Sequence, residues 1–427
     1  MIVLVPSQYM QLKDEIELCL AFAARSGFDV NDVELGLSPA SHVVVKDTQE
    51  IRLDASFLSS SNSHSTTDYF IHYPLEHPMS LESACNAVKQ TNSLVCISVH
   101  DEAQAYFDVW FSHCQFKSVK RNCDGGSKVV NPQRHFAWII TSLALRYSFD
   151  DAVVLANSFA NVSRETWPRQ FDDFGEVIIG IPDLGLQPIK EQTKIPLNFT
   201  PVSKEKLALY PIVDNAIDVE SLLNLGAKTV QIRLKHLDTK QRKAEYKKAI
   251  DHGKRLNAQV FINDDWQLAI ELNAYGVHLG QEDLATADLI QICNAGLALG
   301  VSTHGYFEIL KTNSIKPSYI AFGQVYMAKS KVVDSAPLGL TKLRLFRQLV
   351  ESIKPSDCTK FNQTATVAIG GITLDNANQV LSCNVDGIAV ISAIAGSNSQ
   401  QDTVNRFLSM INKHVLAKSA SATEATC

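Results

Sequence analysis

Polar side chains that could bind an anion lie along one short segment in the second half of the sequence. Gln231, Arg233 and Lys235 alternate with apolar residues, and alternation along a strand places such side chains on one face. Burying arginine and lysine together is unfavourable unless an anion or a carboxylate pairs with them. The segment therefore indicates an anionic ligand or, as the alternative, an internal salt bridge to nearby carboxylates.

Two carboxylates follow the next two apolar segments. Asp264 comes directly after the segment 259–263, and Asp283 comes shortly after the segment 275–279. If these segments are neighbouring strands, their ends bring the two carboxylates together. Two carboxylates that share a metal with phosphate oxygens are a typical site for Mg²⁺. Asp264 alone would also suit the N-cap of a helix, so it is the pair that predicts the metal.

Three later segments are typical of a second phosphate site. The stretch 324–339 is long and carries Lys329 and Lys331, and long loops after strands are often functional. A Gly-Gly pair at 370–371 ends one apolar segment, and the last such segment ends at 390–392. In a parallel barrel, the loops after the last two strands form the usual phosphate site. The sequence thus predicts two phosphate half-sites, one of them with Mg²⁺.

These residues need a scaffold that brings strand ends together, and the second half predicts one. Short apolar segments alternate there with stretches of helical pattern, which favours parallel strands joined by helices. The apolar segments are 207–213, 229–234, 259–263, 275–279, 297–302, 319–323, 366–370 and 386–391. Eight such units fit an α/β fold of the (β/α)₈ TIM-barrel type, and an open doubly wound sheet is the alternative.

The length of 427 residues indicates more than one domain. The stretch 187–206 contains several prolines with little periodicity, so it is the predicted linker. We expect a separate α/β domain at 1–186, the barrel at 207–415 and a disordered tail at 416–427.

The first half is less regular than the second. Four segments have a clear pattern, two of buried strands and two of helices: 1–5 and 94–100, then 11–26 and 81–90. Residues 134–166 predict two helices broken near 148–150, where the Ser148 side chain is suited to cap the second helix.

The composition argues against several classes of partner. The net charge is −6, so no basic excess indicates nucleic-acid or membrane-surface binding. Neither an export signal nor a membrane-spanning segment is expected from the apolar patterning. The nine cysteines are scattered without metal-binding spacing, which is typical of reduced thiols. We expect a cytoplasmic protein that acts on small phosphorylated molecules, and a homo-oligomer stays open.

Seven segments along residues 207–394 carry a recognisable set of motifs. In order, they are Tyr210-Pro-Ile-Val-Asp214, Gln231-Ile-Arg-Leu-Lys235, Ile262-Asn-Asp264, Gly276-Val-His-Leu-Gly-Gln-Glu-Asp283, Gly300-Val-Ser-Thr-His304, Lys329-Ser-Lys331, and Ala368-Ile-Gly-Gly-Ile372 with Val390-Ile-Ser-Ala-Ile394. Together they resemble the thiamine-phosphate synthase (thiamine-phosphate pyrophosphorylase) family. The resemblance implies a transferase of thiamine biosynthesis. It would join 4-amino-5-hydroxymethyl-2-methylpyrimidine diphosphate to a thiazole phosphate, carboxylated or not, and release pyrophosphate through a dissociative pyrimidine-cation step.

The resemblance also implies which residues bind the substrates. Those expected at the pyrimidine diphosphate are Gln231, Ile232, Arg233, Leu234, Lys235, Asn263, Ser302 and Lys331. Those expected at the thiazole phosphate are Ala328, Lys329, Ser330, Gly371, Ile391 and Ser392. Asp264 and Asp283 are expected to bind Mg²⁺. Arg233 and Lys331 are expected to act in catalysis by stabilising charge on the leaving diphosphate.

One loop departs from the family pattern. The usual Thr-x-Thr-Lys reads Ala328-Lys329-Ser330-Lys331 in this sequence. Ser330 keeps a hydroxyl and Ala328 lacks one, while a backbone N–H still suits a phosphate there. We therefore expect weaker binding of the thiazole phosphate rather than loss of activity.

Residues 136–167, with 94–110 before them, resemble the hydroxymethylpyrimidine-phosphate kinase family, which has the ribokinase-like fold. The glycine-rich anion hole of that family is replaced by Pro132-Gln-Arg-His-Phe136. The resemblance implies a degenerate kinase-like remnant, and an unrelated fold is the alternative.

For the whole chain, three other functions stay open beside the synthase. One is a bifunctional protein with an active N-terminal kinase. Another is a thiazole tautomerase-like barrel without coupling activity, and the third is a regulatory barrel that binds thiamine phosphates.

Overall fold

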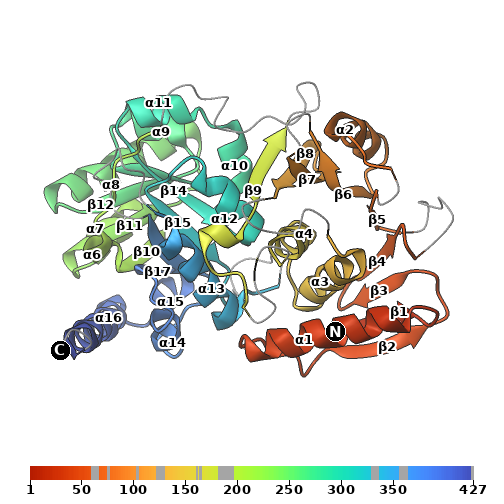
Figure 1. Cartoon of the computed structure of the whole chain (residues 1–427). Coiled ribbons are helices and arrows are strands. Elements are labelled where there is room, and N and C mark those ends of the chain that lie inside the picture. The colour runs from red at the N-terminus through yellow and green to blue at the C-terminus, as the bar shows by residue number, and fades with distance from the viewer. Residues whose placement is uncertain are drawn as a thin grey trace. The chain divides into compact units, whose positions relative to one another are not determined.

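The computed structural model divides into two compact units. Unit 1 comprises Met1–Lys194 with Gly305–Ser314, and unit 2 comprises Ile195–His304 with Ile315–Cys427. Figure 1 labels their helices and strands. The structure describes residues 1–58, 67–74, 77–101, 105–121, 130–159, 162, 166–180, 197–327, 336–354 and 364–424. The division after residue 194 falls inside the stretch predicted as a linker.

Unit 1 is built on a mixed nine-stranded sheet in the order β2-β1-β3-β4-β5-β6-β7-β8-β9. Its strands are β1 (Ile2–Pro6), β2 (Glu34–Ser38), β3 (Val43–Lys46), β4 (Glu50–Ala55), β5 (Tyr69–His72), β6 (Leu94–His100), β7 (Tyr106–Ser112), β8 (Gln115–Lys120) and β9 (Glu176–Gly180). Its helices are α1 (Met10–Arg25), α2 (Leu81–Gln90), α3 (Pro132–Ala144), α4 (Phe149–Ser158) and α12 (Tyr306–Asn313). The strands and helices predicted in the first half are confirmed.

Helices cover both faces of this sheet. Val109 on β7 lies in an apolar cluster with Ala84 and Val88 of α2. Asp108 precedes it and faces the other side, because side chains alternate along a strand; its carboxylate accepts a hydrogen bond from Asn157 of α4. Helix α2 therefore covers one face, and α3 with α4 covers the other (Figure 1).

The two helices predicted within 134–166 are α3 and α4. Helix α3 begins after Asn131, whose side chain accepts a hydrogen bond from the Arg134 N–H (3.0 Å). Helix α4 begins after Ser148, whose hydroxyl accepts a hydrogen bond from the Asp151 N–H (3.1 Å). The cap predicted at Ser148 is confirmed.

Helix α12 groups with unit 1, although its residues lie inside the range predicted for the barrel. Tyr306 is fully buried, and its hydroxyl accepts a hydrogen bond from Trp167 Nε1 (3.2 Å). The N-cap Gly305 has no side chain, and Asp151 of α4 accepts a hydrogen bond from the Phe307 N–H (2.9 Å) instead. A buried carboxylate thus caps α12, and burial raises the pKa of Asp151 to about 6.

Unit 2 is a closed barrel of eight parallel strands. They are β10 (Leu209–Val213), β11 (Thr229–Ile232), β12 (Gln259–Asn263), β13 (Gly276–Leu279), β14 (Ala298–Thr303), β15 (Tyr319–Gly323), β16 (Ala365–Ile369) and β17 (Gly387–Val390). Each strand pairs in parallel with the next, and β17 pairs with β10. The predicted TIM barrel is confirmed, and the open sheet is excluded.

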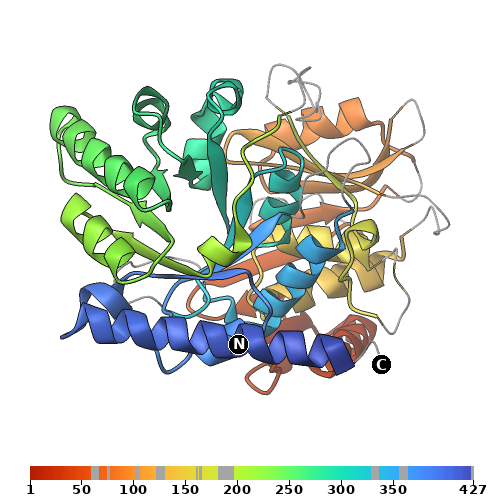
Figure 2. The ribbon, with the colours of Figure 1, turned by 90° about the vertical axis from the view of Figure 1, so that its left-hand side faces the viewer.

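Helix α6 (Lys204–Leu207) of unit 2 precedes β10, and the other helices of this unit follow barrel strands. They are α7 (Ala216–Asn224), α8 (Thr239–Arg255), α9 (Trp266–Glu271), α10 (Gln281–Thr286), α11 (Leu289–Asn294), α13 (Gly339–Ser352), α14 (Ala377–Leu381), α15 (Ser392–Ala395) and α16 (Gln400–Glu424). Figure 2 shows α16 as one long helix. The disordered tail expected from residue 416 is therefore wrong as far as Glu424. Buried Val404 and Phe407 fix the start of this helix, and an alanine-rich end favours its continuation.

Candidate active site

The carboxyl groups of Asp264, directly after β12, and Asp283, in the first turn of α10 after β13, lie close together. Burial together with the charge of Asp283 raises the pKa of Asp264 to about 6. The positive charges of Arg233 and Lys235 lower the pKa of Asp264 and partly offset this rise. The structure thus brings together two carboxylates and two cations that the sequence places on separate segments.

Helix capping does not explain Asp264. The N-cap of α9 is Asp265, whose carboxylate accepts a hydrogen bond from the Tyr246 hydroxyl (2.6 Å) and pairs with Arg242 (3.2 Å). Asp264 adopts a φ of 63°, a left-handed conformation that non-glycine residues adopt at a cost and that clusters at functional sites. Its backbone N–H donates to the carbonyl of His278 on the neighbouring strand (3.0 Å).

The polar residues around the end of β11 are only partly arranged as the sequence predicts. Gln231 is 2% exposed inside the barrel. Lys235 is exposed instead, because β11 ends at Ile232 and strand alternation stops there. In the described ranges, neither Arg233 nor Lys235 has an ion pair within 4.0 Å, so the internal salt bridge is excluded for these ranges. Arg233 is half-buried close to the two carboxylates.

A chain of buried hydrogen bonds crosses the barrel interior, and the sequence analysis missed it as a unit. Gln231 Nε2 donates to the Tyr210 hydroxyl (3.2 Å), which lies 2.8 Å from the Tyr319 hydroxyl. The Tyr319 hydroxyl lies 2.7 Å from Nδ1 of His278, and Nε2 of the same imidazole lies 2.9 Å from Ser302 Oγ. We call these five side chains the polar chain. Burial lowers the pKa of His278 to about 4, so its imidazole is neutral.

The Gly-Gly pair at the end of β16 supports the base of the loop after β15. Gly371 has a φ of 64°, and a Cβ atom there would lie 2.7 Å from Tyr326 Cβ. The Tyr326 N–H donates to the Gly370 carbonyl (3.1 Å). Four residues expected at the substrates, Ala328, Lys329, Ser330 and Lys331, lie outside the described residues.

The other predicted site residues differ in exposure. Ile391 and Ser392, which follow β17, are exposed, and Asn263 at the end of β12 is half-buried. Ile232 and Leu234 are buried, so their side chains are shielded from solvent while Arg233 between them is not.

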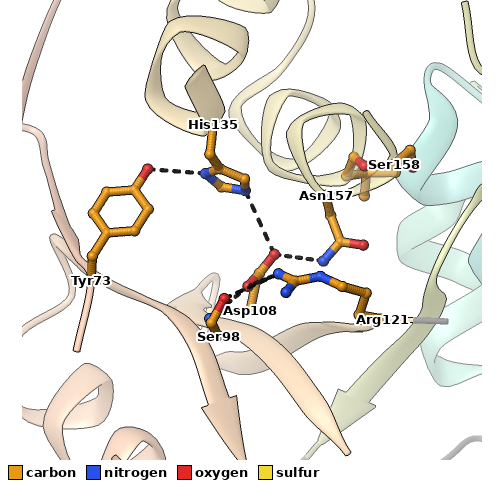
Figure 3. A network of polar contacts seen from close by, with 8 residues as sticks. Tyr73, Ser98, Asp108, Arg121, His135, Asn157 and Ser158 are labelled. Carbon is orange, nitrogen blue, oxygen red and sulfur yellow. Dashed lines mark hydrogen bonds and ion pairs between the residues drawn. The ribbon is translucent and has the colours of Figure 1, made fainter. Parts of the chain in front are cut away.

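Unit 1 contains a second polar cluster, drawn in Figure 3. The Asp108 carboxylate is fully buried and accepts hydrogen bonds from the Ser98 N–H (2.8 Å) and from Asn157 (2.6 Å). Arg121 lies 3.4 Å from it, and His135 lies 3.7 Å from it. Despite burial, contacts with His135 and Arg121 lower the pKa of Asp108 to about 2. The carboxylate is therefore held ionised.

This cluster occupies the N-terminal end of α3, where the sequence comparison expects a kinase anion hole. His135, in the first turns of α3, is 2% exposed, and its Nδ1 lies 3.0 Å from the Tyr73 hydroxyl. The residues that begin α3 include Pro132, which has no backbone N–H to offer a phosphate. In the described part of this end, the His135 ring lies between the Tyr73 hydroxyl and the Asp108 carboxylate.

Among the helices in the described ranges, none is long and apolar enough to cross a membrane. The six cysteines in those ranges are all free thiols. No group of three or more His, Cys, Asp or Glu side chains there is arranged to hold a metal by itself.

Comparisons with known proteins place the similarity in the barrel. The family model for thiamine monophosphate synthase matches residues 209–394. The thiamine-phosphate synthase of Yersinia pseudotuberculosis is 42% identical over 217 residues, which is 51% of this chain and 96% of that protein. The enzyme of the same name from Serratia proteamaculans is 43% identical over 49% of this chain and 94% of that protein.

Among solved structures, the thiamine phosphate pyrophosphorylase of Pyrococcus furiosus is 30% identical over 49% of this chain and 98% of that chain, with a TM-score of 0.43. These matches do not show the kinase resemblance expected for the first half.

Proposed function

We propose, since the chain belongs through its barrel to the thiamine-phosphate synthase family, that the barrel joins 4-amino-5-hydroxymethyl-2-methylpyrimidine diphosphate to 4-methyl-5-(2-phosphoethyl)thiazole, carboxylated or not. The products are thiamine phosphate and pyrophosphate, with carbon dioxide as a further product when the thiazole is carboxylated, and this reaction makes the chain a transferase. One observation carries the proposal: the carboxylates of Asp264 and Asp283 lie beside Arg233 and Lys235 at the end of the barrel where active sites form.

Mg²⁺ fits the two carboxylates. Asp264 and Asp283 offer hard oxygen ligands, and the pKa of Asp264 is raised by burial and by the negative charge of Asp283, which the nearby cations only partly offset. Mg²⁺ is typically bound by one or two carboxylates together with substrate phosphates and water, which agrees with the absence of a third described protein ligand. When bound there, Mg²⁺ would neutralise charge on the diphosphate.

The side chains near this pair suit departure of a diphosphate. Breaking the bond between carbon and the diphosphate leaves a pyrimidine-methyl cation and concentrates negative charge on the leaving group. Arg233 stabilises that charge, as does Lys331, which lies outside the described residues; the removal of one preorganised contact of this kind typically costs about 3 kcal/mol. Gln231, Asn263 and Ser302 orient the pyrimidine diphosphate. Arg233 is half-buried, so its charge is screened less than that of a surface arginine.

The thiazole nitrogen then attacks the cation, and no protein nucleophile is needed. The thiazole phosphate binds Gly371 together with Ile391 and Ser392, with 328–330 on the loop after β15. The left-handed conformation of Gly371 brings this glycine against the base of that loop, and Ser392 is exposed to receive a phosphate.

We propose that unit 1 is a degenerate domain without kinase activity. The support is the buried cluster at the start of α3, where Pro132 and His135 stand in place of a glycine-rich loop. ATP consumption with hydroxymethylpyrimidine phosphate tests this, and measurable turnover would refute it.

The free thiols support a cytoplasmic location.

The experiment that tests the synthase function uses the purified full-length chain. With Mg²⁺ and both substrates, chromatography should detect thiamine phosphate, and omission of either substrate should abolish it. A regulatory barrel would bind the substrates without releasing pyrophosphate. A tautomerase-like barrel would leave the pyrimidine diphosphate intact, so either result would refute the synthase.

A further inference from the structure

The polar chain is unusual because it is buried in an apolar barrel core. Its members Tyr210 and Tyr319 are at most 1% exposed, and Gln231 and His278 are 2% and 7% exposed. Tyr210 and Tyr319 also belong to the apolar cluster of the barrel, together with Phe261 and Val367. Phenylalanine would fill the same space without a hydroxyl that must find a partner. The two hydroxyls therefore need an explanation.

The strand between His278 and Tyr319 is shaped for this chain. Gly300 on β14 pairs in register with His278 on one side and with Tyr319 on the other. A Cβ atom on Gly300 would lie 2.1 Å from Tyr319 Cζ and 2.4 Å from its hydroxyl oxygen. The missing side chain lets the tyrosine ring cross β14 and stack near the imidazole, with ring centres 5.6 Å apart.

The direction of the hydrogen bonds follows from counting protons. An amide nitrogen only donates, so Gln231 Nε2 donates to the Tyr210 oxygen. The Tyr210 hydroxyl has one proton, and Tyr319 is its other partner in the described ranges, so the proton goes to Tyr319. Tyr319 then accepts from Tyr210, and its own proton goes to Nδ1 of His278. Each tyrosine hydroxyl thus donates once.

This direction fixes the tautomer of His278. In a neutral imidazole one nitrogen accepts and the other donates. Because Nδ1 accepts from Tyr319, Nε2 carries the proton and donates to Ser302 Oγ, 2.9 Å away. Ser302 is half-buried. Its hydroxyl proton is not used by the polar chain and is available to a ligand.

We propose that the polar chain sets Ser302 as a hydrogen-bond donor to the diphosphate of the pyrimidine substrate, with His278 and Tyr319 as positioning residues. This inference rests on the proposed function, in which Ser302 contacts that substrate. Diphosphate oxygens only accept hydrogen bonds, so a serine that donates stabilises them. In the reverse direction, the Ser302 hydroxyl would donate its proton to His278 Nε2 and would present only oxygen lone pairs to an anionic ligand.

The first test reads the tautomer directly and needs no activity. Nitrogen-15 NMR of histidine-labelled full-length protein resolves protonated from bare ring nitrogens, and the His278→Gln variant identifies the signal of His278 among the 12 histidines. We expect a neutral ring with the proton on Nε2. A ring with the proton on Nδ1, or on both nitrogens, would overturn the inference even if the enzyme makes thiamine phosphate.

The second test asks whether Tyr319 acts through Ser302. Tyr319→Phe removes the proton given to Nδ1, so the KM for the pyrimidine diphosphate should rise about tenfold or more, the size expected for a hydrogen bond to a charged group. The KM for the thiazole phosphate should stay unchanged. In the Ser302→Ala background, Tyr319→Phe should add less than twofold, because residues that act as a unit are not additive.

Tyr275→Phe is the matched control. Tyr275 also packs near Phe261, but its hydroxyl binds Gln259 outside the polar chain, so neither KM should change. Fully additive losses for Tyr319→Phe and Ser302→Ala in an active enzyme would overturn the positioning role. Absence of any thiamine phosphate from the unaltered chain would refute the proposed function, while the tautomer measurement would still decide the direction of the chain.

Discussion

Gly300 lies between His278 and Tyr319 in the barrel, and its lack of a side chain leaves the space that the Tyr319 ring occupies. Gly300→Ala should therefore lower the free energy of unfolding by about 1–3 kcal/mol, the usual cost of overpacking a core. Thermal denaturation measures it. Gly280→Ala is the control, because its Cβ atom would meet its nearest neighbour at an ordinary 3.4 Å. An unchanged Tm for Gly300→Ala would show that the ring is not confined there.

Asp264→Asn should reduce kcat by about a hundredfold or more, because one charged ligand of the proposed Mg²⁺ is lost. Pyrophosphate release measures it. The Tm should not fall, since the substitution removes repulsion between Asp264 and Asp283.

Asp265→Asn is the neighbouring control for that substitution. It weakens the ion pair with Arg242, which positions α8 and α9, and so should lower Tm while retaining most of kcat. Equal kinetic losses for the two variants would contradict the metal assignment.

Much of the candidate barrel site can be predicted from local sequence, because the end of each strand is marked by a change from an apolar segment to a helical pattern. The carboxylates of Asp264 and Asp283 sit where an apolar segment gives way to a helix, and parallel strands place such ends together. Strand length was harder to predict. Alternation continues through Lys235 in the sequence, yet β11 ends at Ile232, so Lys235 is exposed.

The polar chain could not be predicted as a unit because its members come from five different strands. In the sequence, Tyr210 and Tyr319 lie in apolar segments like any core aromatic residue. Only the closed barrel brings their hydroxyl oxygens within 2.8 Å of each other. Gly300 was a signal: a glycine inside an apolar strand indicates that another group approaches closely.

Asp108→Asn should destabilise unit 1 by about 3–5 kcal/mol, because it removes one charge of the buried Asp108–Arg121 pair. Three of the four tryptophans, Trp110, Trp138 and Trp167, lie in unit 1, so tryptophan fluorescence in urea follows its unfolding.

Asp32→Asn is the control for that measurement. It breaks a largely exposed pair with Arg146 and should cost about 0–1 kcal/mol. If both substitutions cost the same, the buried cluster contributes no more to stability than a surface ion pair.

The stability of unit 1 should also depend on pH through Asp151. Its pKa is raised from 3.8 to about 6 by burial, so the unfolded chain loses the proton at lower pH than the folded chain. The contribution of Asp151 to stability is therefore greatest below the unfolded pKa, falls as pH rises from about 4 to 6, and levels off above that range, with a total loss of about 2–3 kcal/mol.

Asp151→Asn keeps an oxygen to accept from the Phe307 N–H and cannot ionise. The unfolding free energy of this variant minus that of the unaltered protein should rise between pH 4 and 6. A difference that is constant over that range would show that Asp151 titrates alike in both states.

The most direct test of the synthase function is the stoichiometry of its two products in one reaction. Full-length protein, Mg²⁺, the pyrimidine diphosphate and the thiazole phosphate are mixed, and thiamine phosphate and pyrophosphate are quantified together. The account predicts equal amounts of both, and neither when a chelator removes Mg²⁺. Pyrophosphate without thiamine phosphate, or no product from folded protein, would contradict it.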